Sequence, residues 1–131
     1  MARILVVDDE PSILEMLKTL LKTDGHEVVA GLGGVKAKEI LEKEESGSLD
    51  LMISDIRMSP INGMELLKVA REMHSTMSVI MLTAYGQVET AIEALQLGAF
   101  DYIAKPFKVD KLLGTIHRAL ECRQYMKQEE G

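Results

Sequence analysis

Short apolar runs alternate along this chain with longer segments in which apolar residues recur every three or four positions. The runs predict strands at residues 3–7, 28–30, 49–54, 79–82 and 102–104. The periodic segments predict helices at residues 11–24, 37–41, 64–73, 88–95 and 109–120. Pro11 suits the first turn of its helix, and Gly25 and Gly98 follow the ends of theirs. The pattern is therefore five strand–helix repeats.

These repeats predict an α/β fold. Strands that are apolar on both faces belong in a parallel sheet that helices cover on both sides. Right-handed crossovers then favour a flavodoxin-like, doubly wound, five-stranded parallel sheet in the order 2-1-3-4-5, with five helices. We expect one domain over residues 1–123, and a polar tail that frays, or the start of a linker, over residues 124–131.

Composition narrows the functional classes. At 131 residues, with 47% hydrophobic and 27% charged residues, the chain fits one domain with a core. Its formal charge of −6 argues against direct nucleic-acid binding, which needs a basic face. A single Cys122 excludes an internal disulfide and fits a reducing cytoplasm. With no run of ~18 apolar residues and no signal-peptide pattern, we expect a cytoplasmic protein that does not enter a membrane.

Four of the predicted strands end in polar residues. These are Asp8-Asp9, Asp55, Thr83 and Lys105, the last followed by Pro106. Because the carboxyl ends of parallel strands share one edge of a sheet, we expect these side chains to meet in one crevice. Two carboxylates ~4 Å apart repel by roughly 4 kcal/mol at an effective dielectric constant near 20, so a bound cation would relieve the crowding.

The predicted set of side chains suits Mg²⁺ and a phosphoryl group. Carboxylate oxygens are the ligands that Mg²⁺ prefers. An aspartate in such a site can attack phosphorus and form an aspartyl phosphate. The metal and Lys105 would then neutralise charge on the transferring group, and Thr83 can donate a hydrogen bond.

Four sequence stretches carry a resemblance to a known family. They are ILVVDDE at residues 4–10, SDIRM at 54–58, MLTA at 81–84 and GAFDYIAKPF at 98–107. In this order and spacing they resemble the CheY-like receiver domain of bacterial two-component response regulators. Residues 88–91 and 98–102 look most like receivers of the nitrogen-regulatory (NtrC) type.

The resemblance implies a role for each site residue. Asp55 would be the phosphoacceptor, and Lys105 would contact the phosphoryl oxygens. The peptide bond between Lys105 and Pro106 would be cis. Asp9, Asp55 and the backbone carbonyl of Arg57 would ligate Mg²⁺ directly, and Asp8 would hold it through water. Thr83 and Tyr102 would form the switch pair, in which the hydroxyl moves to the phosphoryl group and the ring turns inward.

The resemblance also implies partners. The phosphoryl group would come from a histidine kinase. Phosphorylation would control an output domain, here transcription activation, or a target protein if the receiver stands alone. A homodimer would form through the fourth helix, fifth strand and fifth helix. The domain would be a switch with slow self-dephosphorylation, and not a conventional enzyme.

Some residues have a plainer interpretation or depart from the family. Tyr102 can be explained by packing alone. Three histidines, His26, His74 and His117, are predicted to be ordinary surface residues. The family usually has proline directly after the position of Met58, whereas Ser59 intervenes here. We expect an altered loop and an intact site.

Two other classes of protein remain as alternatives. A phosphatase with an aspartyl nucleophile needs a second acid two residues after it, and that position is Arg57. A flavodoxin-like FMN carrier needs a phosphate-binding loop after the first strand, where Asp8, Asp9 and Glu10 would repel phosphate. Both are weaker than the signalling switch.

Overall fold

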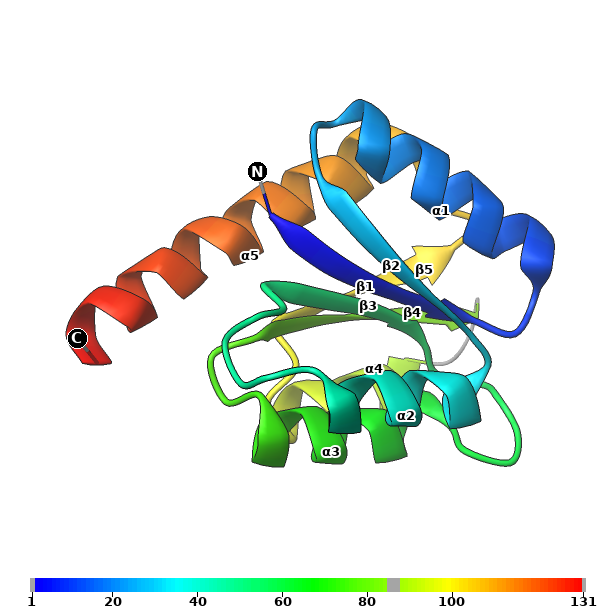
Figure 1. The fold of residues 1–131 in the computed structure, drawn as a ribbon. Coiled ribbons are helices and arrows are strands. Elements are labelled where there is room, and N and C mark those ends of the chain that lie inside the picture. The colour runs from blue at the N-terminus through cyan, green and yellow to red at the C-terminus, as the bar shows by residue number, and fades with distance from the viewer. Residues whose placement is uncertain (1, 85–87, 131) are drawn as a thin grey trace.

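The sheet has the predicted topology. The computed structural model describes residues 2–84 and 88–130, with side chains described over 2–84 and 89–124. Its five parallel strands lie in the order β2-β1-β3-β4-β5 (Figure 1). The strands are β1 (Arg3–Asp8), β2 (Glu27–Leu32), β3 (Leu51–Asp55), β4 (Ser78–Ala84) and β5 (Asp101–Lys105).

Helices cover both faces of this sheet. They are α1 (Pro11–Thr23), α2 (Gly34–Lys43), α3 (Gly63–Met73), α4 (Val88–Gln96) and α5 (Val109–Glu130). In Figure 1, α1 and α5 lie on one side of the sheet and α2, α3 and α4 on the other. The predicted doubly wound α/β fold is therefore confirmed.

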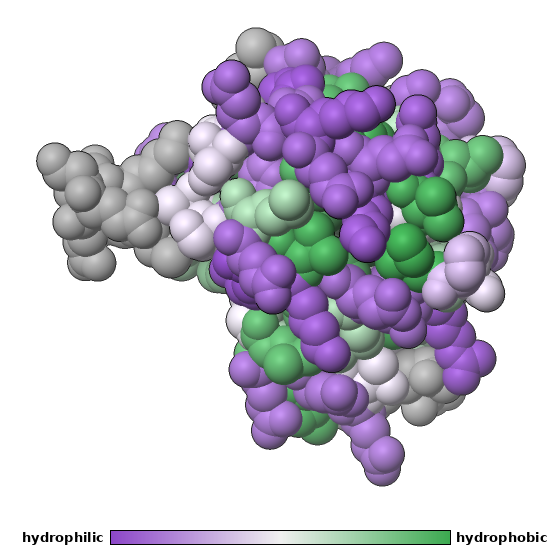
Figure 2. All heavy atoms as spheres, turned by 60° about the horizontal axis from the view of Figure 1, so that its bottom comes forward, coloured by the Kyte–Doolittle hydropathy of each residue, from purple (hydrophilic) through white to green (hydrophobic). Residues whose placement is uncertain are grey.

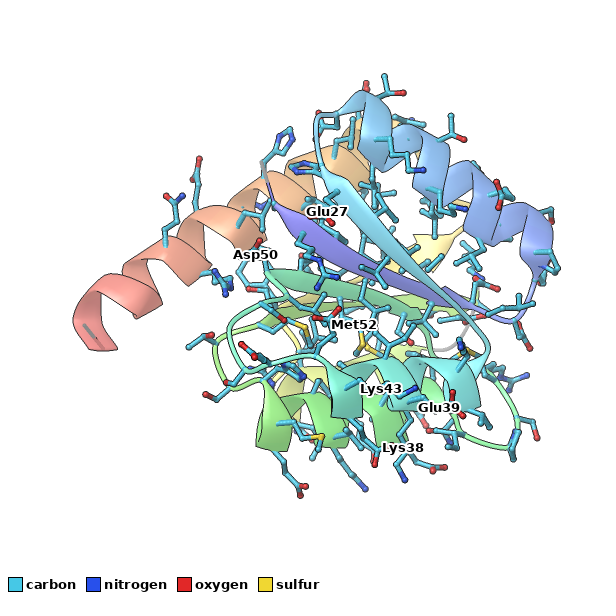
Figure 3. The ribbon with its side chains drawn as sticks, in the orientation of Figure 1. Glu27, Lys38, Glu39, Lys43, Asp50 and Met52 are labelled. Carbon is cyan, nitrogen blue, oxygen red and sulfur yellow. The ribbon has the colours of Figure 1, made fainter. Side chains whose placement is uncertain are left out.

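The core consists of two apolar layers, one on each face of the sheet. Alternate residues of β1 show the division: Leu5 and Val7 face α2 and α3, whereas Ile4 and Val6 face α1 and α5. Residues 4–7 of β1 and 79–82 of β4 are fully buried, as expected for central parallel strands. Met52 points from β3 into the layer above α2 (Figure 3) and fills it as a flexible apolar side chain.

Gly34 shows why the second helix begins earlier than its apolar pattern indicates. β2 continues through Gly31 to Leu32, and α2 begins at Gly34, ahead of Ala37, where the apolar pattern begins. A Cβ atom on Gly34 would lie 2.0 Å from the carbonyl oxygen of Ile61, in the loop between β3 and α3. The glycine therefore allows α2 to approach that loop, which forms part of the site.

Strand β3 begins later than predicted, at Leu51. Leu49 is buried but precedes the strand, and Asp50 links the chain to its neighbours. The backbone N–H of Arg3 donates to Asp50 Oδ2 at 2.8 Å. The carboxylate therefore pairs with β1 where the sheet begins.

The last helix is longer than predicted and is held by a buried arginine. It runs to Glu130, through the stretch that was predicted to be a polar tail or the start of a linker. Arg123 is 3% exposed and its Nη1 lies 2.7 Å from Asp50 Oδ1. Its Nη2 also donates to the carbonyl of Gly47 at 3.2 Å. Asp50 therefore joins α5 to the amino-terminal edge of the sheet, where Figure 3 labels it.

The prediction of three ordinary surface histidines is wrong for two of them. His74 is 1% exposed, and its Nε2 lies 2.8 Å from the carbonyl oxygen of Leu41. His26 has a side chain only 10% exposed and pairs with Asp24, which also binds His117. The prediction failed because two of these contacts, His74 with Leu41 and His117 with Asp24, join residues far apart in the sequence. His117 itself is exposed.

The loops around the site contain two cis peptide bonds. The bond between Lys105 and Pro106 is cis, as predicted. The bond between Ser59 and Pro60 is cis as well, which the sequence did not indicate.

The surface is mostly hydrophilic in the view of Figure 2. Hydrophilic side chains cover most of this face and hydrophobic ones form separate areas. Among the helices that the structure describes, none has the length and apolar character that crossing a membrane requires.

Candidate functional site

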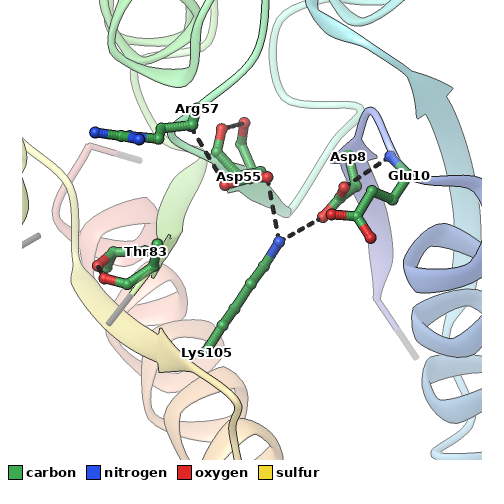
Figure 4. A network of polar contacts seen from close by, with 8 residues as sticks. Asp8, Glu10, Asp55, Arg57, Thr83 and Lys105 are labelled. Carbon is green, nitrogen blue, oxygen red and sulfur yellow. Dashed lines mark hydrogen bonds and ion pairs between the residues drawn. The ribbon is translucent and has the colours of Figure 1, made fainter. Parts of the chain in front are cut away.

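The four polar strand ends meet at the carboxyl edge of the sheet. Asp8 ends β1, Asp55 ends β3, Thr83 lies near the end of β4, and Lys105 ends β5. The strands are in parallel register, with Asp55 beside Leu82 and Thr83 beside Ala104. Figure 4 shows these side chains around one space. The predicted convergence is confirmed for these four positions.

Lys105 joins two carboxylates from different strands. Its Nζ lies 3.0 Å from Asp8 Oδ2 and 3.1 Å from Asp55 Oδ2 (Figure 4). The side chain of Asp8 is fully buried, and that of Asp55 is 11% exposed. Charge-assisted hydrogen bonds of this length partly offset the cost of burying two like charges.

Backbone groups hold both carboxylates from the other side. The N–H of Glu10 donates to Asp8 Oδ1 at 2.9 Å, and the N–H of Arg57 donates to Asp55 Oδ1 at 3.3 Å. The buried hydroxyl of Ser54 donates to the carbonyl oxygen of Asp55 at 3.0 Å. These bonds fix how the Asp55 carboxylate is presented.

Gly63, the first residue of α3, lies against the backbone at the end of β3. A Cβ atom at this position would lie 2.3 Å from the carbonyl oxygen of Asp55 and 2.8 Å from Cα of Ile56. Both neighbours are backbone atoms, which cannot move without displacing the strand end. A glycine here is therefore required for the observed path of the loop.

The electrostatics of the site are those of an incompletely neutralised acidic pocket. Burial raises the pKa of Asp55, and the charge of Asp8 adds to this effect, while Lys105 opposes it. Burial opposes protonation of Lys105, yet its hydrogen bond to Asp8 and the charge of Asp55 together raise the pKa of its ammonium group. One ammonium thus serves two carboxylates.

Further carboxylates adjoin this pair. Oxygen atoms of Asp8, Asp9 and Glu10 lie within 4.8 Å of one another, and Asp9 and Glu10 are exposed. Several carboxylate oxygens that reach solvent are the ligand type that Mg²⁺ takes, because this ion keeps part of its water shell. The residues therefore fit a magnesium ion. Sequence reasoning did not assign Glu10 to the cluster, although its place directly after Asp9 could have indicated it.

The contacts of Thr83 and Tyr102 do not test their predicted roles as a switch pair. Thr83 is 3% exposed, and its hydroxyl donates to the carbonyl oxygen of Ala84 at 2.9 Å. Tyr102 is partly buried and packs against the core layer beneath the sheet. This packing agrees with the plainer interpretation of Tyr102, and the switch remains a prediction.

A polar groove lies beside the acids. It has a volume of about 540 Å³, and its lining includes Asp9, Arg57, Asn62 and Thr90. The groove runs between the loop after β3 and the first turn of α4. It gives a solvent-borne molecule access to the side of the site that Asp9 faces.

Fold and site together define a class of protein, and sequence comparison agrees with it. A family model described as the response regulator receiver domain matches residues 4–117. The chain therefore belongs to the family of response regulator receiver domains.

Its relatives are regulators of the NtrC type. The chain is 41% identical over 127 residues to the regulatory protein AtoC of Escherichia coli, covering 97% of this chain and 27% of that protein. It is 42% identical over 117 residues to the transcriptional regulatory protein ZraR of Klebsiella oxytoca, covering 89% and 26%. The chain thus spans about a quarter of the length of these relatives.

Solved structures agree with the fold. A receiver domain protein from Clostridium thermocellum superposes with a TM-score of 0.91 at 34% identity, covering 96% of this chain and 99% of the other. NtrX from Brucella abortus superposes with a TM-score of 0.90 at 32% identity, covering 98% of this chain and 29% of NtrX. The chain covers nearly all of the first of these two structures and less than a third of the second, which is a longer protein.

Proposed function

We propose that Asp55 accepts a phosphoryl group from a phosphohistidine of a partner histidine kinase. The observation that carries this proposal is the Lys105 ammonium, held between Asp8 and Asp55 at 3.0 and 3.1 Å. One oxygen of Asp55 faces this cation, and the carboxylate is near the surface. A carboxylate in this setting is placed both to attack phosphorus and to have the product's charge neutralised.

The transfer leaves atoms and charges balanced. An oxygen of Asp55 forms the new O–P bond as the P–N bond to the kinase imidazole breaks, and the imidazole keeps that electron pair. The incoming phosphoryl group replaces a carboxylate oxygen as the acceptor for the Lys105 ammonium. The raised pKa of Lys105 keeps this group charged throughout the physiological range.

Mg²⁺ belongs to the proposed reaction. Asp8, Asp9 and Asp55 would hold it, with the carbonyl oxygen of Arg57 as a further ligand. When bound, the ion supplies positive charge to the phosphoryl oxygens. The support for this part is the crowding of carboxylates around a single lysine.

The proposed readout is a change of surface that begins at Thr83. Its hydroxyl bonds only a neighbouring carbonyl among the described residues, so it is free to turn toward a phosphoryl group. We propose that Tyr102 then moves further inward and alters the surface that α4, β5 and α5 share. That surface would contact an output domain or a second copy of the chain.

The proposed output is transcription activation in a longer protein. The support is the similarity to AtoC and ZraR over the receiver portion of each. The alternative output is that of a stand-alone receiver, which acts by binding a target protein.

The test is phosphorylation by a small donor. The protein is incubated with acetyl phosphate and Mg²⁺, and its intact mass is measured. We expect one added phosphoryl group that is stable in acid and lost in base. Asp55→Asn is expected to show none, whereas Asp50→Asn, at the opposite edge of the sheet, retains the adduct. No adduct on the native chain, or an undiminished one on Asp55→Asn, contradicts the proposal.

A further inference from the structure

A second group of metal-ligating side chains lies away from the acidic pocket. Asp24 follows α1, His26 precedes β2, and His117 lies on α5. Asp24 Oδ2 is 2.9 Å from His26 Nε2 and 2.8 Å from His117 Nε2. The three ligand atoms lie within 4.8 Å of one another. The turn between α1 and β2 and the helix α5 thus direct two imidazole nitrogens at one carboxylate oxygen.

We propose that Asp24, His26 and His117 bind a divalent transition-metal cation of the Zn²⁺ class. Two imidazoles and a carboxylate are the ligands that Zn²⁺ takes, usually in tetrahedral geometry with bonds of about 2.0–2.2 Å. That geometry separates neighbouring ligand atoms by about 3.3 Å. The observed separations of 2.8 and 2.9 Å are slightly shorter, so the rings need to withdraw by roughly half an ångström.

The burial of the three groups suits a site with an open position. The side chains of His26 and Asp24 are 10% and 23% exposed, which limits their movement. His117 is 54% exposed, so it can shift to admit a cation, and its outer side leaves room for water as a fourth ligand. The carboxylate of Asp24 supplies the negative charge that attracts the cation.

Binding must change the tautomer of His26. The backbone N–H of Ala2 donates to its Nδ1 at 3.3 Å, so the ring proton lies on Nε2 and is donated to Asp24. A cation on Nε2 takes the place of that proton, and the neutral ring then carries its proton on Nδ1. The bond from Ala2 is lost. This cost limits the affinity, and the tautomer change gives a specific spectroscopic signature.

The consequence of binding would be a link between α5 and the turn that joins α1 to β2. These elements already pack together through an apolar layer that includes Leu21 and Ile116. The cation would fix α5 at His117, well before its end at Glu130. Because His26 precedes β2 and Asp55 ends β3, the two sites lie at opposite edges of the parallel sheet. This inference therefore does not depend on the proposed phosphorylation.

The test is calorimetric titration of the whole chain with ZnCl₂, in chelator-free buffer with Mg²⁺ in large excess. We expect one Zn²⁺ per chain, with at least tenfold weaker binding in His117→Gln and in Asp24→Asn. Asp9→Asn and Cys122→Ser are expected to bind as the native chain does, which separates this site from the acidic pocket and from the exposed thiol. Thermal unfolding in chelator checks that the variants fold.

The tautomer provides the second measurement. Long-range ¹H–¹⁵N spectra of the imidazoles should show the His26 proton on Nε2 without Zn²⁺ and on Nδ1 with it. The absence of Zn²⁺ binding beside excess Mg²⁺ would overturn the proposal. Binding that is equally tight in His117→Gln and Asp24→Asn, or an unchanged His26 tautomer at saturation, would overturn it too.

Discussion

At the scale of single residues, the site depends on a few contacts between side chain and backbone. Lys105 pairs with carboxylates from two strands, Asp8 and Asp55, and the absence of a side chain at Gly63 allows the start of α3 to lie against the backbone of Asp55. Gly63, Asp55 and Asp9 each give a testable consequence for stability.

The first concerns Gly63. Gly63→Ala is expected to destabilise the protein by about 1–3 kcal/mol, because the new methyl group overlaps backbone atoms of Asp55 and Ile56. Urea unfolding measures this. Gly114→Ala in α5 is the control, since a Cβ there meets only the end of Arg118 at 3.6 Å. It should stabilise by about 0.5–1 kcal/mol through helix propensity. Equal changes in the free energy of unfolding for Gly63→Ala and Gly114→Ala would contradict the proposed overlap at Gly63.

The second concerns the pH dependence that Asp55 creates. Its pKa is raised in the folded chain, so ionising it costs stability as the pH rises from its ordinary pKa through the raised value. Without metal, Asp55→Asn should therefore be more stable than the native chain at pH 7. The difference in free energy of unfolding between the variant and the native chain should become smaller as the pH falls from the raised pKa of Asp55 to its ordinary value. Urea unfolding in EDTA between pH 3 and 8 measures it, and a difference that widens on acidification is the opposite of the expected result.

The third concerns Asp9, whose carboxylate lies within 4.8 Å of those of Asp8 and Glu10. In EDTA, Asp9→Asn should stabilise the chain by about 0.5–1 kcal/mol, because it removes repulsion that water partly screens. With saturating Mg²⁺ the native chain should be the more stable of the two, since it binds the ion more tightly than the variant does. Thermal unfolding in EDTA and in Mg²⁺ compares them; a variant that Mg²⁺ stabilises as much as the native chain would exclude Asp9 as a ligand.

At the scale of elements, much of the fold follows from the period of the apolar positions. Continuous apolar runs identified β1, β3 and β4 because central parallel strands are buried on both faces. The boundaries were less accurate where packing decides them. Gly34 begins α2 because the helix must approach the loop that contains Ile61, and no local pattern contains that contact.

The length and position of α5 also depend on a contact distant in sequence. Arg123 and Asp50 are 2.7 Å apart across the molecule, and together they hold the helix against the start of the sheet. The polar composition after residue 123 predicted a tail or the start of a linker, and the helix continues through this stretch to Glu130. Composition alone could not show that this arginine is buried.

The prediction at this scale is that α5 loosens without its anchor. Arg123→Met should destabilise the chain by about 2–4 kcal/mol, because the partly buried Asp50 carboxylate loses its cation. Hydrogen exchange should increase in the second half of α5. Arg118→Met is the matched control. Among the described residues, that exposed arginine donates a hydrogen bond only to Thr115 on its own helix, so the effect of the substitution should stay within about 0.5 kcal/mol. Similar losses from both variants would argue against Arg123 as an anchor.

At the scale of the whole molecule, the fold brings the ends of four strands to one edge, and this convergence was readable in the sequence. Parallel strand order determines that Asp8, Asp55, Thr83 and Lys105 meet, whatever the loops do. The individual side-chain contacts could not be predicted from the sequence. Neither the sharing of Lys105 between two carboxylates nor the meeting of His26 and His117 at Asp24 has a signature in local spacing.

The central claim is that Asp55 is the residue that carries the phosphoryl group. The direct measurement is to phosphorylate the protein with acetyl phosphate and Mg²⁺, reduce the acyl phosphate with borohydride, and map the product by peptide mass spectrometry. Reduction converts a phosphorylated aspartate into homoserine. The account predicts homoserine at position 55 alone. Homoserine at Asp8 or Asp9 instead, or no conversion at position 55 in a chain that gained the phosphoryl mass, would contradict it.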